Sequence, residues 1–474
     1  MTDFIDIPTE LQQVITSEQA WCYTILPKYT DDHNLELFID EQNINQSIVD
    51  ELELLFGKSI KLEGVETERI KKILSKYYRK KESNKLTKAS VFTSQSDDFL
   101  INIISEAEDI GSSDIHIEIY EDRCRVRMRI DGKLIERYVL QKEDYPAIIN
   151  KIKIKANLDI AEKRLPQDGR IFFQTEEQKF DIRVSVLPTL HGEKIVLRLL
   201  SKDATNIEIA SLGMTSEQQI KYKEGIKKPH GIILISGPTG SGKTTTLYAT
   251  LKILNKEYSN IVTVEDPIEY TLEGVNQVQL KESIGLTFAS ALRTFLRQDP
   301  DVIMLGEIRD GETAQMAVRA ALTGHLVLST IHTNSALGTI SRLIDMGVPP
   351  FLVASTLNLS VAQRLVRLLC PKCKSLQKFN VEMYPNGFNP PVEIENHYVP
   401  EGCEHCFYTG YKGRKAVYEM LPVDYNLGCR IKNRQTDEQE IVSEINFKTL
   451  ANSAFELFQK GETSIEEIYP ILFQ

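Results

Sequence analysis

The spacing of apolar residues predicts alternating strands and helices in the second half of the chain. From about residue 206, short apolar runs rich in β-branched residues are separated by helical segments. The runs are Ile232–Ile235, Ile261–Val264, Val302–Leu305 and Leu326–Ser329. Strands separated by helices are typical of a parallel sheet that is covered by helices on both faces. We therefore expect a doubly wound α/β domain over residues 206–474.

Residues 98–205 have a different pattern, with the period of two that half-buried strands show. An amphipathic helix is expected over Phe99–Ile110, followed by strands. Alternation is clearest in Arg123–Ile130, where four arginines share one face. The expected strands are Ile115–Tyr120, Arg123–Ile130, Lys133–Val139, Ile171–Gln174, Phe180–Val186 and Lys194–Leu200. This pattern predicts an α+β domain with an antiparallel sheet, whose arginine face can pair with acidic neighbours.

The first 78 residues are expected to form a small mixed module. The pattern predicts a helix that begins near Pro8, a strand over Leu35–Ile39, and helices over Ile48–Phe56 and Glu66–Tyr78. The next residues, 79–97, are basic and then polar, with no apolar period. We expect a charged linker there, with a nucleic-acid or anionic-lipid patch as the alternative.

Composition and charge exclude several classes of protein. Hydrophobic residues make up 42% of the chain and charged residues 26%, which excludes collagen-like and wholly disordered chains. The net charge of −11 argues against a general nucleic-acid motor. No apolar run approaches the roughly 20 residues of a membrane span, and the first residues lack the basic start of a signal peptide. We expect a soluble cytoplasmic protein with several domains.

A phosphate-binding loop is predicted between the strand Ile232–Ile235 and a helix over Thr245–Asn255. Residues 237–244 fit the pattern G-x-x-x-x-G-K-[ST], in which backbone N–H groups converge on phosphate oxygens. Lys243 is expected to bridge the β- and γ-phosphates of a nucleotide, and the Thr244 hydroxyl to bind Mg²⁺. The expected nucleotide contacts are Gly237, Pro238, Thr239, Gly240, Ser241, Gly242, Lys243, Thr244 and Thr245.

Acidic and histidine side chains follow or flank the other predicted strands. Glu307 comes just after Val302–Leu305, and Glu265 and Glu269 follow Ile261–Val264. Acids at the carboxyl ends of parallel strands face the ligand crevice, where they can hold Mg²⁺ or orient water. The sequence does not divide these roles among the three glutamates. His325 and His332 flank Leu326–Ser329 and are expected to sense the γ-phosphate.

Two cysteine pairs predict a metal site. Cys370 and Cys373, and Cys403 and Cys406, form two C-x-x-C pairs that are separated by 29 residues. Four thiolates complete the tetrahedral coordination of Zn²⁺ and leave no position for water, so the site is expected to be structural. The intervening Lys374–Pro400 is rich in Asn and Pro and is expected to need the metal to fold. Cys22, Cys124 and Cys429 are isolated and are expected to be packing residues.

These motifs together resemble the ATPases of type II secretion and type IV pilus assembly. Four motifs occur in the family's order: Gly237–Thr244 as Walker A, Thr263–Tyr270 as the acidic box, Leu296–Asp310 as the atypical Walker B, and Thr323–Thr333 as the histidine box. Segments similar to the family's second N-terminal domain are Ser113–Glu118, Arg127–Gly132, Arg164–Arg170 and Asp181–Ser185. The resemblance implies a RecA-like P-loop ATPase core, a preceding α+β (PAS-like) domain, a small N-terminal module and a Cys₄ zinc insertion over residues 370–406.

The resemblance also implies how such a chain works. It implies a homo-hexamer that hydrolyses ATP with Mg²⁺ at the inner-membrane face, with platform and docking proteins as partners and no direct nucleic-acid contact. Residues 1–78 would be the docking module. Arg170 and Arg183, with Arg198 a weaker match, would approach the nucleotide from the second domain. Because the N-terminal region resembles only the second half of the family's leading region, regulation by cyclic di-GMP is not expected.

Two other functions stay open at this stage. A DNA-uptake or conjugation-type motor has a similar core, and stimulation of hydrolysis by DNA would distinguish it. A switch that binds ATP without turnover is also compatible with a phosphate loop, although intact Glu265, Glu269 and Glu307 argue against it. The sequence does not separate a pilus from a pseudopilus as the cargo.

Overall fold

The computed structural model describes most of the chain, in two compact units. The described residues are 7–8, 11, 14–31, 33–78, 98–121, 123–174, 179–200, 208–435, 440–441 and 447–473. One unit comprises Met1–Ser201 with Gly402–Thr409, and the other comprises Lys202–Glu401 with Gly410–Gln474. The predicted linker 79–97 and most of the predicted helix near Pro8 lie outside the described residues.

The N-terminal module contains a three-stranded sheet in the order β1-β2-β3. Its elements are α2 (Ser17–Tyr23), β1 (Ile25–Thr30), β2 (Asn34–Asp40), α3 (Gln46–Phe56), β3 (Ser59–Val65) and α4 (Thr67–Tyr77). The predicted strand and the last two predicted helices are confirmed as β2, α3 and α4. The sequence pattern missed β1 and β3, because β1 contains Pro27 and β3 exposes most of its side chains.

The next residues form a six-stranded antiparallel sheet in the order β6-β5-β4-β9-β8-β7. Its elements are α5 (Asp98–Asp109), β4 (Asp114–Ile119), β5 (Cys124–Ile130), β6 (Lys133–Leu140), α6 (Tyr145–Lys155), β7 (Gln167–Gln174), β8 (Lys179–Thr189) and β9 (Gly192–Leu200). Ile103 of α5 and Ile152 of α6 pack with Ile117, Val126 and Leu197 from the strands. The predicted α+β class is confirmed, and α6 is an addition to it.

The predicted arginine face of β5 is half-buried and paired with acids. Arg125 Nε lies 3.0 Å from Glu118 Oε2, and Arg127 Nε lies 2.8 Å from the same oxygen. Burial alone would raise the pKa of Glu118, but hydrogen bonds from Arg127, Lys194 and Arg125 lower it to about 2. The expectation that these arginines pair with acidic neighbours is confirmed for Arg125 and Arg127.

The second unit is built on a seven-stranded sheet in the order β12-β11-β13-β14-β10-β15-β18. The strands are β10 (Gly231–Ser236), β11 (Ile261–Glu265), β12 (Asn276–Gln279), β13 (Val302–Leu305), β14 (Leu326–Ile331), β15 (Leu357–Leu369) and β18 (Tyr411–Pro422). All neighbouring pairs are parallel except β15 with β18, which are antiparallel. The four predicted strands are confirmed as β10, β11, β13 and β14.

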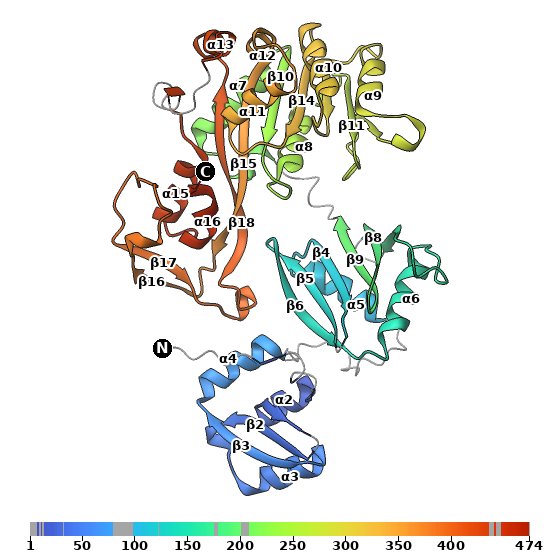
Figure 1. Ribbon diagram of the computed structural model, residues 1–474, viewed down its shortest axis with the longest axis vertical. Helices are drawn as coiled ribbons and strands as arrows, with labels where there is room; N and C mark the ends of the chain where they lie inside the picture. The colour runs from blue at the N-terminus through green and yellow to red at the C-terminus, as the bar shows by residue number, and fades with distance from the viewer. Residues whose placement is uncertain are drawn as a thin grey trace. The chain divides into compact units, whose positions relative to one another are not determined.

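Helices cover both faces of this sheet (Figure 1). They are α7 (Ser216–Lys227), α8 (Lys243–Leu254), α9 (Phe288–Phe295), α10 (Gly311–Leu322), α11 (Ala336–Asp345), α12 (Pro350–Thr356), α13 (Tyr425–Lys432), α15 (Leu450–Gln459) and α16 (Ile465–Leu472). Ile233 and Ile235 of β10 pack with α7 and α8, whereas Ile232 and Leu234 pack in the core that includes α9–α12. Because alternate residues of β10 enter different cores, the strand is buried on both faces, as a doubly wound sheet requires.

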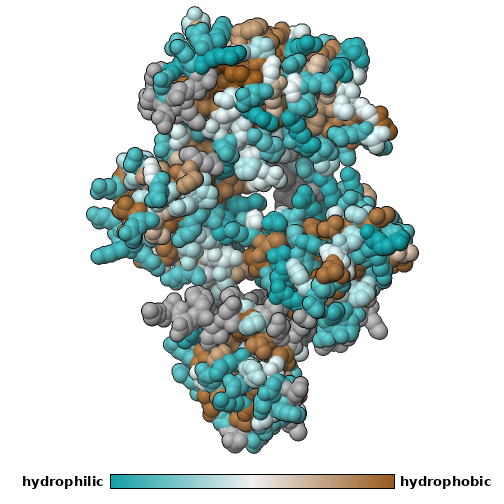
Figure 2. Space-filling model, in the orientation of Figure 1, coloured by the Kyte–Doolittle hydropathy of each residue, from teal (hydrophilic) through white to brown (hydrophobic). Residues whose placement is uncertain are grey.

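The face of the molecule seen in Figure 2 is mainly hydrophilic, and the large apolar cores are formed by buried residues. Figure 2 shows teal and white residues over most of the visible face, with separate brown patches on each part. In the part of the chain that the structure describes, no helix combines the length and the apolar character needed to cross a membrane.

Candidate functional site

The phosphate loop lies at the carboxyl edge of the parallel sheet. In register, Ser236 at the end of β10 is beside Ile331 of β14, and Leu305 at the end of β13 is beside Ser329. The loop leaves β10 at Gly237, where φ is +146°, and enters α8 at Lys243. A Cβ on Gly237 would lie 2.5 Å from the Gln363 carbonyl oxygen, so only glycine fits there.

The loop has the features of a site for a polyphosphate. Lys243 Nζ donates to the carbonyl oxygens of Gly237 at 2.7 Å and Pro238 at 3.0 Å. Burial lowers the pKa of Lys243, the charge of Glu307 raises it in part, and the charge of Arg364 lowers it further. Among the described residues, none gives the buried Ser241 Oγ a hydrogen-bond partner. This unpaired hydroxyl and the free N-terminus of α8 fit an anion bound in the loop.

Glu307 is the glutamate whose charge acts on Lys243 of the phosphate loop. Its Oε1 accepts from Arg309 Nη2 at 2.6 Å, and its Oε2 lies 3.4 Å from His332 Nε2. Burial alone would raise the pKa of Glu307, but the hydrogen bond from Arg309 and the charges of Arg309, His332 and Lys243 lower it. Glu307 is therefore an ionised carboxylate held at the same edge as Lys243.

Glu265 lies at the end of β11 inside a polar network. It is 3% exposed, and it accepts hydrogen bonds from the Tyr248 hydroxyl, from Thr263 Oγ1 at 2.6 Å and from Gln277 Nε2 at 3.1 Å. Three donors from the domain interior orient its two oxygens. The backbone N–H of Glu269 donates to the same Tyr248 hydroxyl at 3.4 Å. The Glu265 carboxylate thus belongs to a buried network around Tyr248, which the backbone of Glu269 also joins, whereas Glu307 pairs with Arg309 and His332.

The two histidines lie at opposite ends of β14, so the expectation that both sense the γ-phosphate needs correction. His332 follows the last residue of the strand and faces Glu307. His325 precedes the first residue, and its Nδ1 lies 2.9 Å from the Ala320 carbonyl oxygen. A six-residue strand separates its ends by about 20 Å, so only His332 is at the edge that carries the phosphate loop.

Arg170, Arg183 and Arg198 form one row across three neighbouring strands of the antiparallel sheet. Arg170 of β7 is opposite Arg183 of β8, which is opposite Arg198 of β9. Side chains directly opposite each other share a face, and like charges in that position repel. Arg198 Nε is 2.9 Å from Asp114 Oδ1, whereas Arg170 Nη1 is 3.7 Å from Asp181 Oδ2. The three arginines therefore share one face of the sheet, and two of them, Arg170 and Arg198, have a carboxylate beside them.

Two buried side chains beside the loop were missed by sequence reasoning. Gln363 and Arg364 of β15 are 2% and 7% exposed, and both contact residues at the phosphate edge. The signal that could have identified them is a polar pair inside an otherwise apolar run, Val361-Ala-Gln-Arg-Leu-Val366. A buried Gln-Arg pair in a strand requires polar partners.

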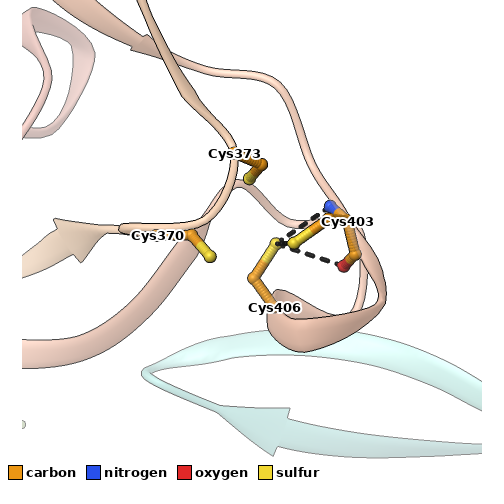
Figure 3. A group of neighbouring side chains, drawn as sticks. All are labelled: Cys370, Cys373, Cys403 and Cys406. Atoms are coloured by element: carbon orange, nitrogen blue, oxygen red, sulfur yellow. Dashed lines mark hydrogen bonds between the residues drawn. The ribbon is translucent and has the colours of Figure 1, made fainter.

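The four predicted zinc ligands converge as expected. Figure 3 shows Cys370, Cys373, Cys403 and Cys406 together, and their sulfur atoms all lie within 4.8 Å of one another. Cys403 Sγ and Cys406 Sγ are 3.8 Å apart. Tetrahedral coordination with Zn–S bonds of about 2.3 Å places sulfurs about 3.8 Å apart, so the cluster fits Zn²⁺. The backbone N–H of Cys403 donates to Cys406 Sγ at 3.2 Å.

The segment between the cysteine pairs packs against the C-terminal helices, which limits the expectation that it needs metal to fold. It contains β16 (Lys374–Lys378) and β17 (Asn396–Pro400), which pair antiparallel. Phe379 lies 4.7 Å from Tyr384 and 5.5 Å from Phe458 of α15, measured between ring centroids. These aromatic contacts attach the segment to the C-terminal helices without metal. Zinc would then chiefly hold the two cysteine turns.

Replacing Cys403 and Cys406 with Ser is therefore expected to release about one zinc ion per chain. Hydrogen exchange should rise at residues 370–374 and 402–410, with a smaller rise in β16 and β17 and none in β10. Metal analysis and hydrogen-exchange mass spectrometry measure both effects, and Cys429→Ser is the control that should retain zinc. Less than about half an equivalent of zinc in the wild-type chain would refute the assignment.

Named relatives align with most of the chain. The profile described as "Type II/IV secretion system protein" matches residues 93–470. The chain is 48% identical over 373 residues to type II secretion system protein E of Pseudomonas aeruginosa, which covers 78% of this chain and 74% of that protein. It is 41% identical to the type IV pilus assembly ATPase PilB of Myxococcus xanthus, over 99% of this chain and 87% of that protein.

Solved structures support the fold. The ATPase DotB of Legionella pneumophila is similar with a TM-score of 0.59 and 21% identity, over 82% of this chain and 97% of that chain. The pilus retraction motor PilT with bound ADP gives a TM-score of 0.53 and 27% identity, over 78% and 95%. With the phosphate loop, the ordered motifs and the cysteine cluster, these matches show that the chain belongs to the type II/IV secretion system protein family of ATPases.

Proposed function

We propose that this chain is a homo-hexameric motor that hydrolyses Mg·ATP to power assembly of a type IV pilus or of the pseudopilus of a type II secretion system. One observation carries the proposal. The phosphate loop 237–244, Glu307 and His332 lie at one edge of a parallel sheet, in a family whose relatives are named for these machines. The hexamer, the cargo and the inner-membrane location are inferred from that family.

The residues at this edge have distinct chemical tasks in the proposal. The loop N–H groups and Lys243 bind the phosphates, and the Thr244 hydroxyl, exposed in the first turn of α8, would hold Mg²⁺. Mg²⁺ would supply charge neutralisation at the phosphates. Glu307, held ionised by Arg309 and His332, orients the attacking water. His332 also suits contact with the terminal phosphate.

We propose the same domain organisation that the sequence suggests. Residues 1–78 are a docking module, 79–97 a linker, 98–205 the arginine-bearing domain and 206–474 the ATPase domain with the 370–406 zinc module. The separate sheets and cores of the first two parts support independent modules. The docking module would bind inner-membrane proteins of the machine at its cytoplasmic face, and membrane association would be through these partners.

Arg170→Ala or Arg183→Ala is expected to lower kcat by at least about 100-fold while nucleotide affinity changes by less than about tenfold. The arginines lie outside the phosphate-loop domain, so we propose that they reach the nucleotide only on domain closure, within one chain or between neighbours. Steady-state kinetics and nucleotide titrations measure the two effects. Arg164→Ala, at an exposed arginine paired with Glu162, is the control. If only nucleotide affinity fell and kcat stayed unchanged, these arginines would bind ATP without contributing to the chemical step.

A complementation experiment tests the proposed machine. In the native host, a strain that carries the Glu307→Gln chain should lose surface pili or secreted substrates, as a deletion strain does, although the chain is present at normal level. The purified wild-type chain should not be stimulated by DNA. Normal assembly in the Glu307→Gln strain would refute the motor function, and strong stimulation by DNA would favour the DNA-uptake or conjugation-type alternative.

A further inference from the structure

The strand β15 runs beside the strand that leads into the phosphate loop. It is the parallel neighbour of β10, and Ala362 is in register with Ser236, the last residue before the loop. The next two residues of β15, Gln363 and Arg364, therefore lie beside the loop itself. Neither belongs to the loop motif, and Gln363 is separated from Ser241 by 122 positions in the sequence.

The Gln363 amide connects the phosphate loop to the helix that follows it. Its Nε2 donates to the Ser241 carbonyl oxygen at 2.9 Å, and its Oε1 accepts from Thr246 Oγ1 at 2.9 Å. The Ser241 carbonyl requires this orientation of the amide, because the reverse would place two acceptors together there, whereas the Thr246 hydroxyl could donate or accept. A Cβ on Gly242 would lie 2.8 Å from Gln363 Nε2, so the loop is packed directly on this side chain. The amide thus holds the end of the loop to the first turn of α8.

The Arg364 guanidinium connects β15 to the segment after β14 and lies against the start of the loop, because a Cβ on Gly237 would lie 3.2 Å from Arg364 Nη1. Its Nη1 donates to the Gln363 carbonyl oxygen at 3.1 Å, and its Nη2 donates to the Asn334 carbonyl oxygen at 3.0 Å. Asn334 is two residues beyond His332, which faces Glu307. The planar guanidinium therefore spans from the start of the loop to the chain that carries His332.

Arg364 also places a second cation near Lys243. The two residues are 7% and 9% exposed, and the charge of Arg364 contributes to the lowered pKa of Lys243. Two buried cations repel each other, and a bound polyphosphate relieves that repulsion. The arrangement therefore favours the nucleotide-bound loop.

We propose that Gln363 and Arg364 are positioning residues for the nucleotide. Gln363 holds the phosphate loop in the shape that binds phosphate, and Arg364 links this loop to the segment that carries His332. The inference rests on the proposed function, because it concerns the same site. Neither side chain needs to touch the nucleotide.

The chain offers a matched control for Gln363. Gln218 of α7 is 8% exposed, donates from Nε2 to the Tyr418 carbonyl oxygen at 3.0 Å, and accepts at Oε1 from the Thr215 N–H at 3.0 Å. Replacing either glutamine with Glu keeps the acceptor and removes the donor to a backbone carbonyl. Both variants should lose a similar amount of thermal stability. Only Gln363→Glu should weaken binding of a fluorescent ADP analogue, by about tenfold or more.

A second pair of variants serves if Gln363→Glu does not fold. Thr246→Val removes the donor to Gln363 Oε1, whereas Thr246→Ser keeps a hydroxyl there. Thr246→Ser should bind the analogue at least about three times more tightly than Thr246→Val. Thr250→Val is the control for loss of a buried hydroxyl. Thr250 lies one turn after Thr246, and this variant removes the hydrogen bond from Thr250 Oγ1 to the Thr246 carbonyl oxygen.

Arg364→Lys tests the link to the segment after β14. Lysine keeps the charge but has one ammonium nitrogen in place of the two guanidinium nitrogens that donate to separate carbonyl oxygens, so kcat should fall by about tenfold while analogue affinity stays within about threefold. If the wild-type chain neither binds the analogue nor hydrolyses ATP, the proposed function fails. If the wild type is active, equal affinities of Gln363→Glu and Gln218→Glu, or of Thr246→Val and Thr246→Ser, overturn this inference alone, as does an unchanged kcat in Arg364→Lys.

Discussion

Lys243→Ala is expected to abolish ATP turnover and to leave the fold intact. The Lys243 ammonium is buried and donates to two carbonyl oxygens of its own loop, Gly237 and Pro238. Because burial disfavours the charged form, removing this ammonium should not lower thermal stability. The phosphates, however, would lose the cation that bridges them, and turnover depends on it. Phosphate release and a thermal melt of the same preparation measure both effects.

Lys252→Ala is the matched control for this variant, since Lys252 is an exposed lysine in the last turn of the same helix. Its turnover and melting temperature should equal those of the wild type. If Lys243→Ala hydrolysed ATP at the wild-type rate, hydrolysis would take place elsewhere, and the assignment of the site to residues 237–244 would be wrong.

Glu307→Gln is expected to reduce turnover by at least about 100-fold and to leave ATP binding nearly unchanged. Gln has the shape of Glu and still accepts from Arg309, so the local structure should persist. Gln lacks the negative charge, which Arg309, His332 and Lys243 stabilise on Glu307. In the proposed function, this charge orients the attacking water. Nucleotide titration should give an affinity near that of the wild type, and single-turnover kinetics should show the loss in the chemical step.

Glu312→Gln, at an exposed residue of α10 paired with Arg293, is the control and should turn over normally. Wild-type rates in Glu307→Gln would transfer the role to Glu265 or Glu269. The geometry argues against a transfer to Glu265, because its carboxylate already accepts hydrogen bonds from Tyr248, Thr263 and Gln277.

Four of the parallel strands, β10, β11, β13 and β14, were predictable because they are buried on both faces. A strand such as β10 is a continuous apolar run, which differs clearly from the helices beside it. The long pair β15 and β18 was not predicted, since each strand mixes buried apolar residues with charged ones such as Arg364, Arg367 and Lys415. Their pairing joins segments about 50 residues apart, which no local pattern records.

The site was predictable where its residues are contiguous and not where the fold assembles them. The loop 237–244 is one motif, and Glu307 follows a strand whose end had to lie at the same edge. His325 and His332 are close in the sequence, but the strand between them separates them in space. Gln363 is far away in the sequence and reaches the loop only because β15 pairs with β10.

The cysteine pairs also show that a local motif predicts a site but not what stabilises the segment around it. Their spacing predicted the convergence of Cys370, Cys373, Cys403 and Cys406, because thiolates at this spacing suit one tetrahedral ion. The spacing gave no information on Phe379 and Tyr384, whose rings pack against α15. The intervening segment is therefore packed against distant aromatic residues, in addition to the proposed zinc site.

The most direct test of the central claim is phosphate release by the purified, zinc-loaded full chain, counted per chain at saturating ATP with Mg²⁺. The account predicts that release continues well beyond one phosphate per chain, stops when Mg²⁺ is chelated, and is absent in Lys243→Ala. A chain that binds ATP tightly and yet releases no more than one phosphate would be a nucleotide-dependent switch, and that result would contradict the assignment of this chain as a motor.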